Sequence, residues 1–174
     1  DHHFWPTAKN IIAPSQACTT DLTVNGSYGV FGGNSISTPY VSGAASLVLS
    51  VAPGFTSNQV RFVLEATAQK VPEMDGKYLT CEHGSGLLDV ESAVIEALSP
   101  SYPTNTIISS VTSQLIHRAY SDIVVSASLP TYADVNLHAG NEIVLSDGAT
   151  FAANANSELH LYVGKSYVCK SVVD

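Results

Sequence analysis

Residues 33–45 read Gly-Asn-Ser-Ile-Ser-Thr-Pro-Tyr-Val-Ser-Gly-Ala-Ala, and this segment constrains the fold more than any other. A glycine lets the backbone turn tightly and lets another main chain approach closely. The small and apolar residues after Ser35 predict a helix that runs to about Val51, so Ser35 falls at a helix N-terminus, where unpaired N–H groups favour negative charge. We expect Pro39 in the first turn, where its missing donor is not needed. This arrangement is suited to presenting a nucleophilic serine.

Signals for two further helices follow in the sequence. Thr56 and Gln59 have the spacing of a capping box, and the residues behind them recur at helical spacing. Asp89 is placed to cap a third helix, from Val90 to Leu98. The apolar side expected for the second helix consists of Val60, Val63, Leu64 and Thr67.

Short strands are expected around these helices. Residues 9–13 predict a buried strand that Pro14 ends, and residues 86–88 predict another. The pair Asn25-Gly26 marks a turn between the first strand and Ser35.

The character of the chain changes at residues 99–104, whose prolines and hydroxyl residues are typical of a linker. Beyond it, residues 137–151 resemble short β-repeats found after catalytic domains in secreted bacterial surface proteins. Such rungs stack their strands so that alternate residues pack inward. A small β-sandwich is the alternative, because the period is weak. The expected strands are Thr106–Val111, Ile123–Ala127, Val135–Leu137, Glu142–Leu145 and Leu159–Val163.

Composition excludes several classes of function. The formal net charge of −8 argues against nucleic-acid binding, and the absence of any apolar run near 18 residues argues against a membrane span. The cysteines at positions 18, 81 and 169 have no zinc-knuckle spacing. Cys18, Cys81 and Cys169 allow one disulfide with one free thiol, or pairing to another chain, and the sequence does not choose between these. A surface rich in Ser, Thr and Asn favours a secreted or cell-surface setting.

The segment around Ser35 resembles the serine motif of the subtilisin-like serine peptidases (subtilases). Further segments resemble family landmarks in the same order: residues 10–15, 26–33, 52–60 and 84–90. The resemblance implies an α/β fold for residues 1–98, as the C-terminal portion of a parallel-sheet peptidase domain. Residues 99–174 would then be a small all-β accessory domain, either a sandwich or a short β-solenoid.

The same resemblance assigns roles to three residues. Ser35 would be the nucleophile, with Gly33 and Asn34 in the vicinity of the substrate and the oxyanion. Asn34 departs from the family's usual threonine and Tyr40 from its usual histidine. A structural calcium ion is common in the family, but no ligand set is visible in this chain, and no other cofactor is expected.

The catalytic partners of Ser35 are missing from the sequence. In the family the chain order is Asp, then His, then Ser, so both partners and the oxyanion asparagine should precede Ser35 by far more than 34 residues. His2 and His3 are interpreted as loop residues and Asp89 as a helix cap. We therefore expect a docked amino-terminal half of the peptidase domain, as a separate chain or as upstream sequence, against which residues 10–13 would pair.

The resulting expectation is a secreted serine endopeptidase that hydrolyses polypeptide substrates, of which this chain carries only the nucleophile. The alternative is a catalytically inactive subtilase homologue that acts as a binding or scaffold surface, and Asn34 is its sequence support. The β-rich region is expected to be a structural extension, with surface attachment or carbohydrate binding as the weaker interpretation.

Overall fold

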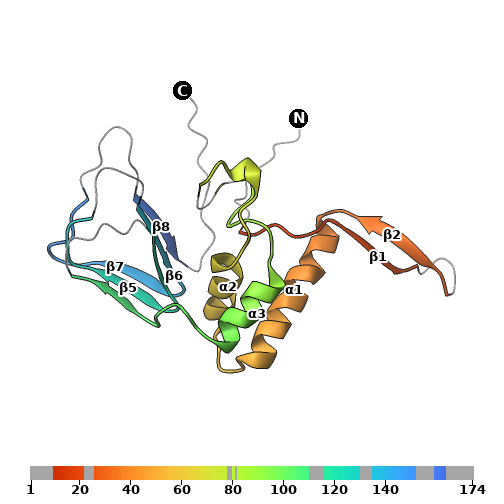
Figure 1. Ribbon diagram of the computed structural model, residues 1–174, viewed down its shortest axis with the longest axis horizontal. Coiled ribbons are helices and arrows are strands. Elements are labelled where there is room, and N and C mark those ends of the chain that lie inside the picture. The colour runs from red at the N-terminus through yellow and green to blue at the C-terminus, as the bar shows by residue number, and fades with distance from the viewer. Residues whose placement is uncertain are drawn as a thin grey trace.

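The structure is a computed structural model that describes residues 10–21, 26–77, 80, 82–109, 116–129, 135–151 and 159–163. Helices and parallel sheets together make an α/β arrangement. A β-hairpin projects from one side, three helices lie in the middle, and stacked strands lie on the other side (Figure 1). Cys81, Cys169, His2 and His3 lie outside the described residues.

The hairpin consists of β1 (Gln16–Thr20) and β2 (Tyr28–Gly32), which pair antiparallel. Helix α1 (Asn34–Val51) follows directly. The sequence predicted the turn at Gly26 but not the two strands that flank it, because these strands expose most of their residues and lack a clear alternation of apolar and polar side chains.

Helices α2 (Ser57–Ala66) and α3 (Val90–Leu98) match the predicted segments. The capping box is present in full, with the Thr56 hydroxyl accepting from the Gln59 N–H and the Gln59 side chain accepting from the Thr56 N–H. The Asp89 carboxylate accepts from the Ser92 N–H at 2.9 Å. A short 3₁₀ helix, η1 (Pro72–Met74), lies between α2 and α3.

The predicted strands at residues 9–13 and 86–88 are reduced to single bridges. Ile12 pairs with Leu87 in parallel, and Leu87 pairs on its other side with Gln69 in antiparallel. The backbone hydrogen bonds from Ile12 N to Gly86 O and from Leu88 N to Ile12 O are 2.9 and 2.8 Å. These bridges hold the segment before the hairpin against the segment that enters α3.

The β-rich region forms two three-stranded parallel sheets, in the orders β3-β5-β7 and β4-β6-β8. Two-residue corners join β4 to β5 and β6 to β7. Parallel pairing of successive corner-linked strands is the arrangement of stacked rungs, whereas the strands of a sandwich pair antiparallel. The division into two domains stays a prediction. The strands are β3 (Thr106–Ile108), β4 (Ile116–Ala119), β5 (Asp122–Val125), β6 (Val135–Ala139), β7 (Glu142–Leu145) and β8 (Leu159–Val163).

Strand β4 was not predicted, because His117 and Arg118 interrupt its apolar pattern. The strand predicted from Thr106 is shorter than expected and ends at Ile108, and Val111 lies outside the described residues. A compact apolar cluster fills the space between the two sheets. Its fully buried members include Ile123, Val125, Val135 and Leu137.

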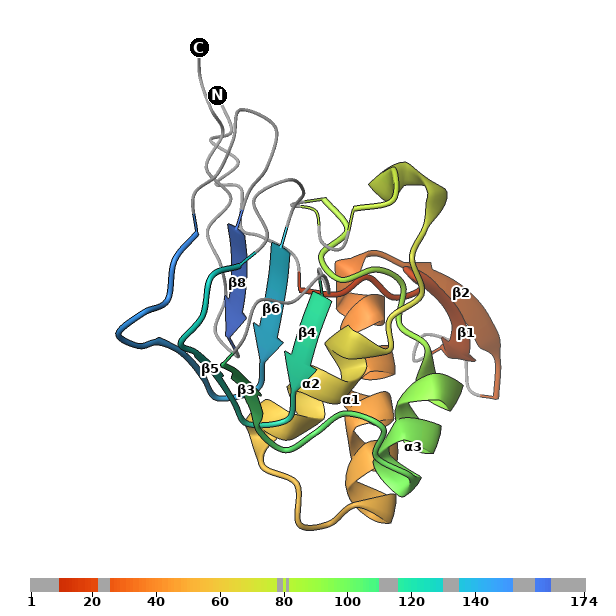
Figure 2. The same ribbon diagram turned by 60° about the vertical axis from the view of Figure 1, so that its left-hand side comes forward.

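A second apolar cluster joins α1, α2 and α3. Helix α2 is buried on more than the predicted side, because Phe62 and Glu65 are also buried. The sheet β4-β6-β8 lies beside α2 (Figure 2), and the Phe62 ring contacts His138 and Tyr120 with centroid distances of 4.8 and 5.1 Å. We call the contact of this sheet and its corner Tyr120 with α2 and α3 the junction.

Candidate active site

The predicted site residues Gly33, Asn34 and Ser35 lie together at the N-terminus of α1. Gly33 is the N-cap, with φ 124° and ψ 171°, a conformation that glycine adopts without strain. Asn34 and Ser35 are the first two helical residues, and all three are exposed. The backbone N–H groups of this first turn have no partner within the helix, so they are available to an incoming oxygen that carries negative charge.

Side chains of α1 fix the start of the helix to the preceding segment. The Ser37 hydroxyl donates to the carbonyl oxygens of Ala13 and Pro14, at 3.2 and 3.1 Å. The Gly33 N–H donates to Ser15 O at 2.8 Å. These bonds place Ser35 at a fixed corner between the hairpin and the helix.

The prediction that Pro39 lies in the first turn is wrong. Pro39 lies inside the helix, five residues after Asn34. In a regular helix the N–H of residue 39 would donate to the carbonyl of Ser35, and proline has no N–H to give. The helix continues through Pro39 nonetheless, since α1 extends to Val51.

Within the described ranges, no side chain forms a hydrogen bond or an ion pair with Ser35. The described histidines belong to the loop at residues 82–84 and to strands β4, β6 and β8. His138 instead contacts Glu65 of α2. The chain therefore presents a serine at a helix N-terminus without an imidazole beside it among these residues.

Helix α1 leaves apolar surface uncovered on both flanks. A hollow of about 560 Å³ lies between α1 and α2 and includes Leu49, Phe55 and Asn10 in its lining. A second, of about 500 Å³, lies between α1 and the hairpin and includes Tyr40 and Leu47. Leu47 and Leu49 are 50% and 40% exposed. The Asn10 Nδ2 atom is buried and has no hydrogen-bond partner among the described residues, whereas a buried amide nitrogen ordinarily has one.

Two carboxylates at the junction are buried, and their burial was not predicted from the sequence. The Tyr120 hydroxyl donates to Glu96 Oε1 at 2.5 Å, and the backbone and hydroxyl of Ser101 donate to the same carboxylate at 2.7 and 2.6 Å. Burial alone would raise the pKa of Glu96, but the hydrogen bonds from Ser101 and Tyr120 outweigh it and hold this pKa below its ordinary value of 4.5. Burial and the adjacent Glu96 carboxylate raise the pKa of Tyr120.

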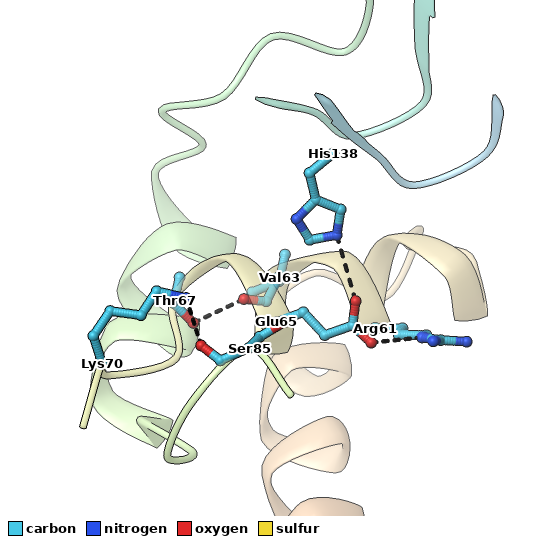
Figure 3. Close-up of polar contacts among 7 residues, drawn as sticks. All are labelled: Arg61, Val63, Glu65, Thr67, Lys70, Ser85 and His138. Atoms are coloured by element: carbon cyan, nitrogen blue, oxygen red, sulfur yellow. Dashed lines mark hydrogen bonds and ion pairs between the residues drawn. The ribbon is translucent and has the colours of Figure 1, made fainter. Parts of the chain in front are cut away.

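The second carboxylate, Glu65, lies between Arg61 and His138 (Figure 3). Arg61 Nε is 2.7 Å from Glu65 Oε1, and His138 Nε2 is 3.4 Å from Glu65 Oε2. Nearby, Lys70 Nζ donates to Ser85 O at 2.5 Å, and burial, with Arg118 close by, lowers the pKa of Lys70 from 10.5 to about 8. The spacing of Arg61 and Glu65 would ordinarily suggest an exposed ion pair, so only the packing of the sheet reveals the role of Glu65.

The described part of the chain contains no cluster of three or more His, Cys, Asp or Glu residues suited to a metal ion. Cys18 is an exposed free thiol on β1. In the described ranges no helix has both the length and the apolar character that a membrane crossing requires.

Comparison with known proteins agrees with the geometry of this end of the chain. Residues 2–86 match the model of the Subtilase family, so this part of the chain is a subtilase-like peptidase fragment. It is 37% identical over 84 residues to a subtilisin of Bacillus pumilus, an alignment that covers 48% of this chain and 28% of that protein. Subtilisin E of Bacillus subtilis (strain 168) is also 37% identical, and alkaline elastase YaB of a Bacillus species is 34% identical, each over 84 residues.

The alignments with the last two relatives cover 48% of this chain and 20% of each relative. The chain therefore spans between a fifth and three tenths of the length of these curated relatives. The strands of the junction lie beyond the matched residues.

Proposed function

We propose that this chain is the nucleophile-bearing portion of a subtilisin-type serine endopeptidase. The observation that carries the proposal is Ser35, which is exposed as the second residue of α1, two positions after the N-cap Gly33 with its φ of 124°. The Ser35 oxygen would attack the carbonyl carbon of a peptide bond, and the N–H groups of the first helical turn would stabilise the negative charge that develops on the carbonyl oxygen. The match to the Subtilase family over residues 2–86 supports this role.

The proposal requires groups from outside the described residues. A histidine must take the proton of Ser35 and an aspartate must orient that histidine, and we propose that both, with an oxyanion asparagine, come from an amino-terminal portion that docks on this chain. The two hollows that flank α1, the exposed Leu47 and Leu49, and the buried Asn10 amide support a docking face at this position.

A fluorophosphonate probe tests the nucleophile. With the amino-terminal portion present, the probe should label the wild-type chain at Ser35, and Ser35→Ala should abolish labelling. Ser42→Ala, a matched change on the same helix, should leave labelling intact. A wild-type assembly that stays unlabelled while a control peptidase reacts would exclude catalysis by Ser35.

Gly43 offers a separate test of the docking face. An added Cβ at Gly43 meets no heavy atom within 4 Å in this chain, and Gly43 lines the hollow between α1 and the hairpin. Gly43→Ala should stabilise the chain by itself by up to about 1 kcal/mol and weaken its binding to the amino-terminal portion. Unchanged binding would argue against docking at this hollow.

The second candidate is a catalytically inactive homologue that serves as a binding or scaffold surface, and Asn34 beside Ser35 is the residue that favours it. Absence of the Asp or His motif from the amino-terminal portion would decide for this candidate. For either candidate we propose a secreted or cell-surface location, and a structural role for the stacked strands, which cover α2 through the junction.

A further inference from the structure

The junction contains a histidine that is almost completely removed from water. His138 is 3% exposed, and its ring lies against Phe62 on one side and Tyr162 on another, with centroid distances of 4.8 and 6.2 Å. The carboxylate of Glu65 lies 3.4 Å from the His138 Nε2 atom. Figure 3 shows this imidazole directed from the sheet onto α2.

The charges around His138 are predominantly positive. Arg118 is its register neighbour on β4, and Lys70 follows α2 in sequence. The negative charge of Glu65 is already shared with Arg61 at 2.7 Å. Among the described residues, the charged and titratable groups around His138 include Glu65 and Arg61 from α2, Lys70 after α2, Arg118 from β4, and Tyr162 and the stacked His160 from β8.

We propose that the junction is acid-sensitive, and that protonation of His138 loosens the sheet β4-β6-β8 from helix α2 and uncovers Phe62. A positive charge on the imidazole would be buried away from water, beside two cations and beside a carboxylate that already has a cationic partner. When the sheet separates from α2, His138 gains water, and the protonated form is no longer penalised.

The direction of the pH dependence follows from burial. Burial, partly opposed by the hydrogen bond to Glu65, lowers the pKa of His138 below its ordinary value of 6.5. The closed junction therefore binds this proton less readily than the open one. The equilibrium constant that favours the closed junction is largest well above pH 6.5. It falls as the pH decreases toward the lowered pKa, by up to about tenfold per pH unit for one proton.

Hydrogen exchange of the full 174-residue chain tests the proposal without reference to peptidase activity. Protection factors, corrected for the chemical exchange rate, are measured for α2 and β6 at pH 7.5, 6.5 and 5.5. In the wild-type chain we expect them to fall by no more than about twofold between pH 7.5 and 6.5 and by up to about fivefold between pH 6.5 and 5.5.

His138→Gln should remove this pH dependence, whatever its effect on absolute protection, because glutamine does not titrate. The matched control is His160→Gln, on the same face of the sheet but less buried, and it should retain the wild-type dependence. A His138→Gln chain that keeps the wild-type dependence would overturn the proposal.

If His138→Gln fails to fold, the wild-type chain supplies the decisive measurement. An NMR titration of the His138 ring should give an apparent pKa below 6.5, with loss of α2 and β6 protection at the same pH. An imidazole that protonates at or above pH 6.5 while the junction stays protected would refute the mechanism. Because no readout depends on Ser35, failure here is distinguishable from failure of the proposed peptidase function.

Discussion

Gly140, at the corner between β6 and β7, gives the most direct test of how the rungs stack. A Cβ added to Gly140 would lie 2.2 Å from Tyr120 O and 3.5 Å from Phe62 Cβ. An ordinary contact requires about 1 Å of additional separation, and the atom in the way belongs to the backbone. The rungs would have to move apart at the same corner where Gly140 N donates to Ala119 O at 3.1 Å.

The expected cost of Gly140→Ala combines two effects. Overpacking of this kind costs about 1–3 kcal/mol, and loss of the corner hydrogen bond adds about 1 kcal/mol. We therefore expect unfolding to be easier by about 2–4 kcal/mol, which for a chain of this length lowers Tm by roughly 4–16 °C. Urea and thermal unfolding followed by circular dichroism measure both quantities.

Gly54→Ala is the matched control, because a Cβ there meets nothing within 4 Å. It should change the free energy of unfolding by less than about 0.5 kcal/mol. If Gly140→Ala is as stable as the Gly54→Ala control, then the rungs are not in the close contact described, and the reasoning fails.

Three further predictions concern single interactions. Tyr120→Phe removes the hydroxyl bonded to Glu96 and should cost about 1.5–3 kcal/mol in urea unfolding, whereas the exposed Tyr28→Phe should be neutral; equal effects would show that the Tyr120 bond adds nothing. Thr56→Ala removes the α2 cap and should cost about 1 kcal/mol, with Thr56→Ser close to wild type, and a neutral Thr56→Ala would contradict the capping. Because the pKa of Glu96 is lowered in the folded chain, its stabilisation is present above pH 4.5 and is lost as the pH falls through that lowered pKa; urea unfolding between pH 6 and 3 should show this loss, and Glu96→Gln should reduce it.

Local signals were enough to predict the helices. The capping box at Thr56, the cap at Asp89 and the helix that begins beside Ser35 depend on residues three or four positions apart. The position of Ser35 at a helix N-terminus is confirmed, and its catalytic role stays a prediction.

The junction could not be predicted, because its partners are distant in sequence. Glu65 meets His138 and Glu96 meets Tyr120 only when the stacked strands lie against the helices. In the sequence, Glu65 occupies the position of an ordinary solvent-facing partner of Arg61. Strand β4 was missed for the same reason, since Arg118 interrupts its pattern and makes its contact with Tyr102 through tertiary packing.

The corners of the rungs are short and constant, whereas the returns between rungs are not. Both β4 and β6 are followed by a two-residue corner, yet Asn136 pairs with a residue twenty positions before it and Leu159 with one twenty-four positions before it. Insertions between rungs are therefore compatible with the stacking, while a single residue added at a corner would turn every following side chain of that strand to the opposite face. Natural variation in length should thus collect at one edge of the stack, and the opposite edge should keep a fixed spacing.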